Sequence, residues 1–591
     1  MPDPLESNVE RLVRRHGVRL DPERVDRSCE AFLRRLRGGT PAVSARRWVL
    51  PGLAASAVFA ATLWLALVPS REQAADWSRA ARLVEPAAPP LPPSGNAAFR
   101  DVTAATGLGA AMEAHVRAFP RWTQAGMTFA DLDGDGALDL HLASLDPAAP
   151  ALLASNHGFG RFARVEPGGP VPRRTRISHP LPYPGGMIRL AGDLDEDGAL
   201  DLFAAWHGNG GELWLNRSRT GFEPIFEFRR APFLDDEFPA LRHCAFADLD
   251  GDGRVDLLRN DESARARLHR GRGDGTFDPK PALTLETGLP SGGVIPVDLD
   301  GDGDLDLLCR RTGFTGPDGR RIFRNDGNLK FSAATAEFGL DENGSIHGTG
   351  DLNHDGAPDL VCVEGAGVEI YLNDGAGRFA RRAGAVRGLE RAPWKPHAQY
   401  GRGWGGAAVT DFDNDGAADV IVNGKFFLYV LRGLGNGDFE YANDRWALPS
   451  VSYCTVDDGV CFGDFDGDGR LDVVAATGRQ GSDERTVGLF RNELRERGWL
   501  RVQLSGRPGN RMAAGARIRL TEPGTGRLLW SEQISAWNRQ SFHSYYAQAS
   551  TERHFGLGER AAADVRVDFP SGRSALRRGV PANATVLVRE E

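Results

Sequence analysis

The sequence predicts an all-β protein in which a seven-bladed β-propeller is followed by a small C-terminal β domain and preceded by a single transmembrane helix. Three observations support this prediction. A nine-residue acidic pattern occurs seven times at intervals of 50 to 62 residues, short strand-like runs surround each copy, and one uncharged apolar segment lies near the N-terminus. The 591 residues are 41% hydrophobic and 26% charged, which excludes a disordered chain and a multi-span membrane protein.

Residues 1–47 form an Arg-rich cytoplasmic leader before the apolar segment 48–68, which predicts a transmembrane anchor. The leader has eleven arginines against seven acidic residues, and the 21-residue segment is long enough to cross a bilayer as a helix. Because positive residues stay on the cytoplasmic side, we expect the bulk of the chain to be periplasmic or extracellular. A cleaved signal peptide is the alternative, since Arg46 and Arg47 before the apolar run are similar to a twin-arginine signal. Residues 69–96 are rich in Ala and Pro and predict a stiff linker.

The acidic pattern reads D-x-D-x-D-G-x-x-D, and its copies are numbered here as loops 1 to 7. Carboxylates at positions 1, 3, 5 and 9, with a backbone carbonyl at position 7, supply the oxygen ligands that Ca2+ prefers at about 2.3–2.6 Å. Glycine at position 6 permits a sharp turn around the ion, and Leu or Phe at position 2 predicts an apolar plug. The predicted ligands of up to seven Ca2+ ions are Asp131, Asp133, Asp135 and Asp139 (loop 1); Asp193, Asp195, Asp197 and Asp201 (loop 2); Asp248, Asp250, Asp252 and Asp256 (loop 3); Asp298, Asp300, Asp302 and Asp306 (loop 4); Asp351, Asn353, Asp355 and Asp359 (loop 5); Asp411, Asp413, Asp415 and Asp419 (loop 6); and Asp464, Asp466, Asp468 and Asp472 (loop 7).

The pattern fits an EF-hand, a magnesium site or a metal-free turn less well than a calcium loop between strands. An EF-hand needs a glutamate at position 12 and flanking helices, whereas no copy has that glutamate and the flanks read as strands. Mg2+ keeps its waters and demands octahedral geometry, so it fits the loops less well than Ca2+. Metal-free turns would bring several carboxylates together without a cation, which is strongly repulsive.

A second feature follows each acidic loop by about 25 residues, a hairpin and then a strand that opens with phenylalanine. These phenylalanines are Phe162, Phe277, Phe331, Phe379 and Phe439, with a looser version at Phe222. The seventh repeat lacks this strand, but Phe99 to Thr103 forms one before the first acidic loop. We expect the first strand to complete the last sheet and to close a ring of seven four-stranded blades over residues 97–495.

These repeats resemble the FG-GAP/VCBS repeats of the integrin α propeller, and the resemblance implies calcium in the loop that joins the inner two strands of each blade. Residues 496–591 resemble the ASPIC/UnbV domain of cartilage acidic protein and its bacterial relatives. The stretches that carry this second resemblance are Gly498–Val502, Gly515–Ile518, His554–Gly558, Phe569–Gly572 and Pro581–Asn583. The long leader and anchor depart from the plain signal peptide expected of such proteins.

The charge distribution limits the possible partners. The formal net charge is −9, although 27 aspartates lie in the seven loops, so the acidity is concentrated there. Neither a basic nucleic-acid-binding face nor a uniformly acidic coat is expected, and no nucleic acid is predicted as a partner. The partner expected instead is an unknown protein or glycan, with the membrane contacted through the N-terminal helix.

The sequence contains no HExxH, GxSxG, P-loop or dinucleotide motif, so no catalytic residue is predicted. The expected function is that of a membrane-anchored, non-enzymatic, calcium-binding platform for binding or cell adhesion. The alternatives are a propeller-based enzyme of polysaccharide or secondary metabolism and an envelope sensor.

Several smaller features are assigned to packing. The histidines beside the acidic loops and the tryptophans that could stack on sugars are both expected to fill cores: His243, His347, His354, His397, Trp206, Trp214, Trp394 and Trp404. Cys244, Cys309 and Cys362 lie in apolar runs and predict buried thiols. Cys454 and Cys461 are near enough in sequence to pair in an oxidising compartment, a question that spacing leaves open.

Overall fold

The computed structural model divides the chain into two units, residues 1–85 and 86–591, and the residues that it describes lie in the second. They are 98–119, 124–144, 152–156, 158, 160–165, 187–206, 211–217, 226–230, 241–261, 263–289, 293–311, 319–342, 344, 346–364, 367–392, 406–424, 427–446, 448, 460–478, 485–534, 547–548 and 552–591. The predicted leader, anchor 48–68 and linker 69–96 lie outside these ranges. No helix among the described residues is long and apolar enough to cross a membrane.

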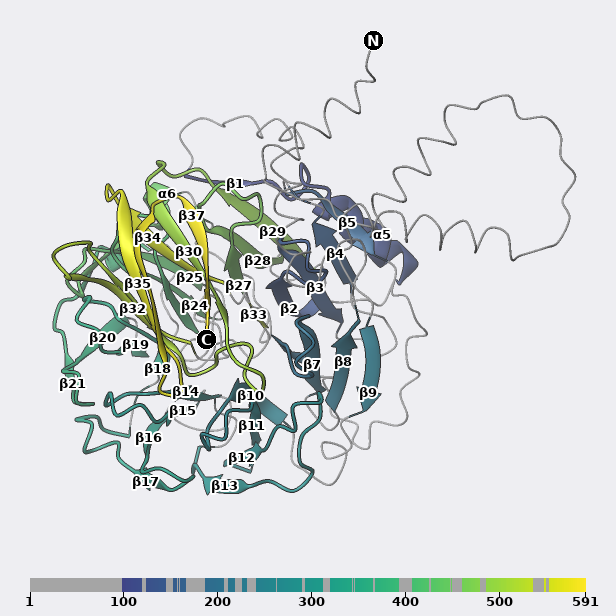
Figure 1. Ribbon diagram of the computed structural model, residues 1–591. Helices are drawn as coiled ribbons and strands as arrows, with labels where there is room; N and C mark the ends of the chain where they lie inside the picture. Colours follow the sequence, from purple (N-terminus) through teal and green to yellow (C-terminus); the bar gives the residue numbers. More distant parts are fainter. Residues whose placement is uncertain are drawn as a thin grey trace, which may run out of the picture. The chain divides into compact units, whose positions relative to one another are not determined.

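The chain forms many small antiparallel sheets, as an all-β sequence predicts, and six of them use strands consecutive in sequence (Figure 1). The first three repeats are β2 (Gln124–Ala130), β3 (Asp139–Ser144), β4 (Leu152–Asn156) and β5 (Phe162–Val165); β6 (Met187–Gly192), β7 (Asp201–Trp206), β8 (Gly211–Asn216) and β9 (Phe226–Arg230); and β10 (Leu241–Ala247), β11 (Asp256–Asp261), β12 (Arg265–His269) and β13 (Leu283–Glu286). The next three are β14 (Gly293–Val297), β15 (Asp306–Arg311), β16 (Gly319–Asn325) and β17 (Phe331–Ala333); β18 (Ile346–Gly350), β19 (Asp359–Glu364), β20 (Gly367–Asn373) and β21 (Phe379–Arg381); and β23 (Ala407–Thr410), β24 (Asp419–Gly424), β25 (Phe427–Gly433) and β26 (Phe439–Tyr441), with β22 (Val386–Arg387) parallel to β26.

The seventh sheet joins the two ends of the repeat region. It contains β27 (Val460–Gly463), β28 (Asp472–Gly478), β29 (Arg485–Asn492) and, beside β29, the first strand β1 (Phe99–Asp101) (Figure 1). Phe99 is buried between Phe412 and Trp446. Arg100 pairs with Glu493 at 2.8 Å. The prediction that the first strand completes the last sheet is therefore confirmed.

A recurring asparagine links neighbouring repeats. It ends the third strand of a repeat, and its side-chain amide donates to the backbone carbonyl of the position-2 residue in the acidic loop of the preceding repeat. These bonds run from Asn216 to Leu132, from Asn373 to Leu299 and from Asn492 to Phe412. Asn156 of the first repeat makes the same bond to Phe465 of the seventh, at 2.8 Å. The first repeat therefore follows the seventh as the second follows the first.

The C-terminal domain consists of two sheets that share one apolar core with repeats 5 and 6. One sheet contains β30 (Gly498–Ser505), β34 (Arg553–Gly558) and β37 (Ala584–Arg589), and the other contains β31 (Arg517–Thr521), β32 (Leu528–Gln533), β35 (Ala562–Asp568) and β36 (Ser574–Pro581). Alternating residues of both sheets, such as Val502, Phe555, Ile518 and Val565, are fully buried. One further strand of this domain, β33 (Ala547–Gln548), pairs in parallel with β2 of the first repeat.

The structure differs from the sequence prediction in its short helices and in where some outer strands begin. Between β1 and β2 lies a helix that was not predicted, α5 (Leu108–Ala118), which buries Leu108, Met112 and His115 at helical spacing against the first repeat. Short helical turns also occur at η2 (Leu389–Arg391) and α6 (Asn443–Trp446).

The outer strands open with the predicted phenylalanine in only some repeats. Phe162, Phe331, Phe379 and Phe439 begin their strands as expected. Phe277 instead makes an isolated bridge to Gly271, and the outer strand of the third repeat begins at Leu283. In the second repeat the outer strand begins at Phe226, and Phe222 lies outside the described residues.

Candidate metal centres

Each acidic loop connects the first and second strands of its repeat. Position 1 directly follows the first strand, and position 9 is the first residue of the second strand. The strand register pairs the residue before position 1 with position 9, as in Gly350 with Asp359 and Gly463 with Asp472. The predicted ligands at positions 1, 3 and 5 therefore lie in the turn of each hairpin, and the predicted ligand at position 9 begins its second strand.

The position-9 aspartate holds the loop together through backbone hydrogen bonds. One of its oxygens accepts the N–H of position 2 and the other accepts an N–H at the end of the third strand. In loop 5 these donors are Leu352 and Asn373, both at 2.8 Å from Asp359. All seven loops have such a pair of bonds, although in loop 3 the second donor, Gly271, lies just beyond the end of the third strand. The acidic pattern predicts only a metal ligand at position 9, whereas the structure shows that this residue also braces three segments of backbone.

The apolar and glycine positions of the pattern behave as predicted. The seven position-2 residues are buried, from Leu132 and Leu299 to Phe412. Position-6 glycines have positive φ, for example 98° at Gly356 and 87° at Gly469. At Gly469 a Cβ would also overlap the indole of Trp499, so glycine is required there for two reasons.

The carboxylates converge. In at least five loops, ligand oxygens of three aspartates lie within 4.8 Å of one another, with the triplets Asp131, Asp133 and Asp139; Asp193, Asp195 and Asp197; Asp248, Asp250 and Asp256; Asp298, Asp300 and Asp302; and Asp411, Asp413 and Asp419. A cluster of hard oxygen ligands at this spacing could hold a divalent cation.

Burial makes ionisation of these carboxylates unfavourable. It raises the pKa of Asp139, Asp256 and Asp359 to about 8, and repulsion from neighbouring loop aspartates adds to the effect. At position 1, burial and the nearby carboxylates raise the pKa of Asp193 and Asp351 to about 7. A bound cation would remove this penalty, since it favours the ionised form.

Several buried carboxylate oxygens make no hydrogen bond within the described part of the chain. Oδ1 of Asp193 and Oδ1 of Asp248 make no hydrogen bond to any described residue, and each side chain is at least nine-tenths buried. Oδ1 of Asp131 is in the same situation. Since buried polar atoms are normally satisfied, these carboxylates fit a cation held at the loop.

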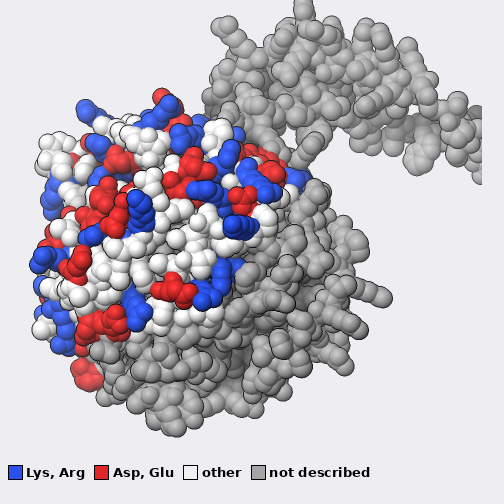
Figure 2. Space-filling view, turned by 90° about the horizontal axis from the view of Figure 1, so that it is seen from below, with Lys and Arg blue, Asp and Glu red and all other residues white. Residues whose placement is uncertain are grey.

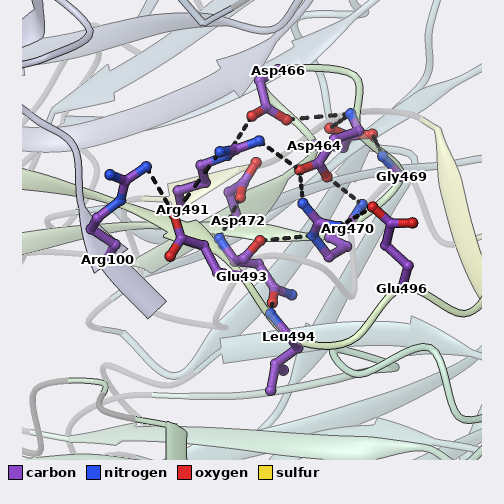
Figure 3. Close-up of polar contacts among 12 residues, drawn as sticks. Arg100, Asp464, Asp466, Gly469, Arg470, Asp472, Arg491, Glu493, Leu494 and Glu496 are labelled. Atoms are coloured by element: carbon purple, nitrogen blue, oxygen red, sulfur yellow. Dashed lines mark hydrogen bonds and ion pairs between the residues drawn. The ribbon is translucent and has the colours of Figure 1, made fainter. Parts of the chain in front are cut away.

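Arginines of the same repeat reach some loops. In loop 7, Arg491 contacts Asp466 at 2.7 Å (Figure 3). Arg491 also contacts Asp468 at 3.1 Å, and Arg470 pairs with the same Asp468. In loop 6, Arg432 contacts Asp413 at 2.9 Å and also Asp415. Arg217 pairs with Asp195 in loop 2 and Arg270 with Asp250 in loop 3. Arg470 occupies position 7 of its own loop, whereas the other arginines lie outside the nine-residue pattern; none of these ion pairs was predicted from the sequence.

The C-terminal domain contacts acidic loops 3 to 7. Its direct polar contacts include Arg517 to Asp298 of loop 4 at 2.9 Å, Arg501 to Asp464 of loop 7, and His554 Nε2 to Asn414 Oδ1 of loop 6 at 2.6 Å. Ser531 donates to the carbonyl of Gly356 in loop 5, and Val255 in loop 3 donates to the carbonyl of Gly509.

The packing predictions are confirmed where the structure describes them. Cys244, Cys309 and Cys362 are buried, and burial raises the pKa of Cys244 to about 12. His243 is buried beside Arg310, and its pKa falls to about 3. Trp214 packs against an apolar cluster of the first two repeats. His397, Trp394, Trp404 and Cys454 lie outside the described residues, so the pairing of Cys454 with the buried Cys461 stays open.

Family models identify both parts of the chain. The FG-GAP-like repeat matches residues 193–259, 248–309, 351–422 and 411–475, and the ASPIC and UnbV model matches residues 506–591. The protein is therefore an FG-GAP repeat protein with a C-terminal ASPIC and UnbV domain, and such repeats fit a propeller.

The chain is similar to proteins named Cartilage acidic protein 1. The relative from Mus musculus is 29% identical over 273 residues, which cover 43% of this chain and 38% of the relative, and the Homo sapiens relative gives the same values. The relative from Xenopus tropicalis is 23% identical over 476 residues, 65% of this chain and 70% of the relative. The match thus spans well under half the length of the mouse and human proteins.

Solved structures with likeness to this chain include two lectins. One is an Agrocybe aegerita lectin that recognises non-reducing terminal N-acetylglucosamine, with a TM-score of 0.40 and 22% identity over 54% of this chain and 79% of the lectin. The other is the BP39L lectin from Burkholderia pseudomallei, with a TM-score of 0.37 and 14% identity over 62% of this chain and 95% of the lectin. Scores this low carry no argument.

Proposed function

We propose that the protein is a calcium-stabilised, seven-bladed propeller that acts outside the cytoplasm as a binding or adhesion platform for a protein or glycan. The observation that carries the proposal is the convergence of buried aspartates in the acidic loops, whose oxygens need a cation. Each ion would clamp the first two strands of a blade where they separate. Extracellular calcium modules bind at roughly 0.1–1 mM, so such a protein would fill its loops outside the cell.

Contacts between the first and the seventh repeat support a closed ring. The pairing of β1 with β29 and the bond from Asn156 to Phe465 both join the first repeat to the seventh. A ring of four-stranded sheets leaves only short, protected edges, which suits a rigid display surface.

Binding rather than catalysis is proposed, because calcium coordination and backbone bracing account for the paired carboxylates of the loops. Figure 2 shows basic and acidic side chains interspersed over the described part of one face. A mixed surface of this kind gives no single-sign field to steer a highly charged polymer. The proposed platform is held at the outer face of a membrane by residues 48–68.

The test is a calcium titration of the full-length chain by calorimetry, combined with thermal unfolding. We expect several calcium ions to bind, and each to stabilise the fold by about 1.4 kcal/mol at a calcium concentration ten times its Kd. Asp248→Asn with Asp250→Asn should remove one site and lower the melting temperature in calcium. A chain that melts at the same temperature in calcium and in chelator would refute the proposal.

A further inference from the structure

The C-terminal domain places two arginines on position-1 aspartates of the repeats, while a third, Arg497, reaches the position-3 aspartate Asp413 of loop 6 at 3.1 Å. Arg517, at the start of β31, contacts Oδ2 of Asp298 at 2.9 Å, and Arg501, in β30, contacts Oδ2 of Asp464. Both aspartates occupy position 1 of their loops, and both side chains are at most 4% exposed. A guanidinium there occupies a carboxylate oxygen that a cation would use, and its charge repels the cation.

These contacts differ from the arginine contacts made within a repeat. Arg470 lies in loop 7 itself and Arg491 in β29 of the same sheet, and they reach Asp466 and Asp468, at positions 3 and 5. Arg501 and Arg517 come from another domain. Release of these two arginines therefore requires a change in how that domain lies on the loops.

Residues of both domains hold the guanidinium of Arg501 in place. Its guanidinium lies 4.9 Å from the ring centre of Trp499 and 3.7 Å from Glu552 of its own domain. Burial works against its charge, but the carboxylates of Asp464 and Glu552 outweigh burial, so the pKa of Arg501 is raised. At loop 4 the backbone N–H of Asp298 also donates to Gln533 of β32 at 2.8 Å.

Loop 5 provides the contrast within the same interface. The C-terminal domain reaches it through Ser531 and through Trp530, whose ring centre is 4.9 Å from that of His354. Among the described residues, no ion pair involves Asp351, Asp355 or Asp359. Docking at loop 5 therefore leaves the carboxylates available to a cation.

We propose that calcium and the C-terminal domain compete for the position-1 aspartates of loops 4 and 7, so that these two loops fill last and their filling loosens the domain. This inference rests on the calcium sites proposed above. Binding linkage is reciprocal. If docking of the domain lowers the calcium affinity of loop 4 or 7 by some factor, calcium in that loop lowers the docking equilibrium constant by the same factor.

The two tryptophans allow the loops to be observed separately. Trp499 touches Gly469 of loop 7, and Trp530 touches His354 of loop 5. Terbium, a luminescent calcium substitute, is excited through a nearby indole, so a titration of the full-length chain reports on both loops. Trp499→Phe and Trp530→Phe assign the two components of the signal.

We expect the Trp499 component to appear at a higher terbium concentration than the Trp530 component. Arg501→Gln should shift only the Trp499 component, to a concentration about tenfold lower, because a like charge next to the site is removed. Arg501→Lys keeps the charge and should leave the order unchanged, which separates charge from packing. Arg566→Gln is the matched control, since that exposed arginine pairs with Asp568 within its own domain.

Hydrogen exchange measures the other side of the linkage. Raising calcium through the last binding step should speed exchange in β30 and β31 of the unmodified chain. Arg501→Gln with Arg517→Gln should remove this response. If Arg501→Gln binds terbium at loop 7 as weakly as the unmodified chain does, the competition is overturned while the calcium sites stand. If neither loop binds terbium or calcium, the proposed function itself fails.

Discussion

The fifth and seventh repeats carry the same acidic pattern but balance its charge in different ways. Loop 5 has no ion pair to its carboxylates among the described residues, whereas three arginines, Arg470, Arg491 and Arg501, reach the carboxylates of loop 7. The repeats also differ in construction. The strands of repeat 5, β18 to β21, are consecutive, but repeat 7 is completed by β1 from the start of the chain.

The difference teaches that the nine-residue pattern defines where a cation fits but not how strongly the site needs one. In repeat 5 no ion pair to the carboxylates of the loop is found among the described residues, so under the calcium proposal the fold there depends on metal. In repeat 7 arginines already pair with the carboxylates, and the sheet depends more on a strand that arrives from nearly 390 residues away.

The largest expected effect is on the stability of the metal-free chain as a function of pH. This dependence measures how many loop carboxylates, over all repeats, have no positive partner. The folded pKa values of Asp359 and Asp351 are raised to about 8 and about 7, above the unfolded value of about 4. The folded state then binds more protons than the unfolded state between those values, so stability is greatest at low pH and is lost as pH rises. Each such group removes about 1.4 kcal/mol per pH unit in that window.

Denaturant unfolding of the calcium-free chain from pH 5 to pH 8 measures this loss. Saturating calcium should flatten the profile, because the ion stabilises the ionised carboxylates. A metal-free chain whose unfolding free energy rises with pH over this range would show that the loops are already neutralised.

The second prediction tests whether strand β1 stabilises repeat 7 in particular and not repeat 5. Phe99→Ala should destabilise the chain by about 3–5 kcal/mol, because it empties a buried site between Phe412 and Trp446. Hydrogen exchange should speed up in β28 and β29 and stay slow in β19 and β20. The control is Val116→Ala on the exposed side of α5, where the change should be small. Equal loss of protection in both repeats would mean that β1 does not act on repeat 7 in particular.

The smallest effects compare the same position of the two loops in chelator. Asp468→Asn should destabilise the chain by about 1–3 kcal/mol, since it leaves Arg470 and Arg491 without their shared carboxylate. Asp355→Asn should instead stabilise it slightly, by less than about 1 kcal/mol, because the charge of Asp355 disfavours ionisation of Asp351. In calcium, Asp355→Asn should become destabilising through the lost ligand. The measurement is thermal melting of both variants with and without calcium. If both variants shift the melting temperature in the same direction in chelator, loops 5 and 7 do not differ in how their charge is balanced.

The sequence by itself determined the features that depend on residues close together in the chain. The seven acidic loops, the buried plugs such as Phe412, the position-6 glycines and the hairpin strands follow from local spacing, because a turn between two strands needs only nine residues to form. The offset of Phe99 even predicted its pairing with the last sheet, since a missing strand at one end matched an extra one at the other.

Only the tertiary structure decided which distant groups reach the loops. The bonds from Asn156 to Phe465, from Arg501 to Asp464 and from Arg517 to Asp298 join residues 309, 37 and 219 positions apart. Helix α5 was readable from its apolar spacing, but the docking of the C-terminal domain was not. That docking depends on how two folded surfaces fit, and spacing along a chain carries no information about the fit between surfaces that form only after folding.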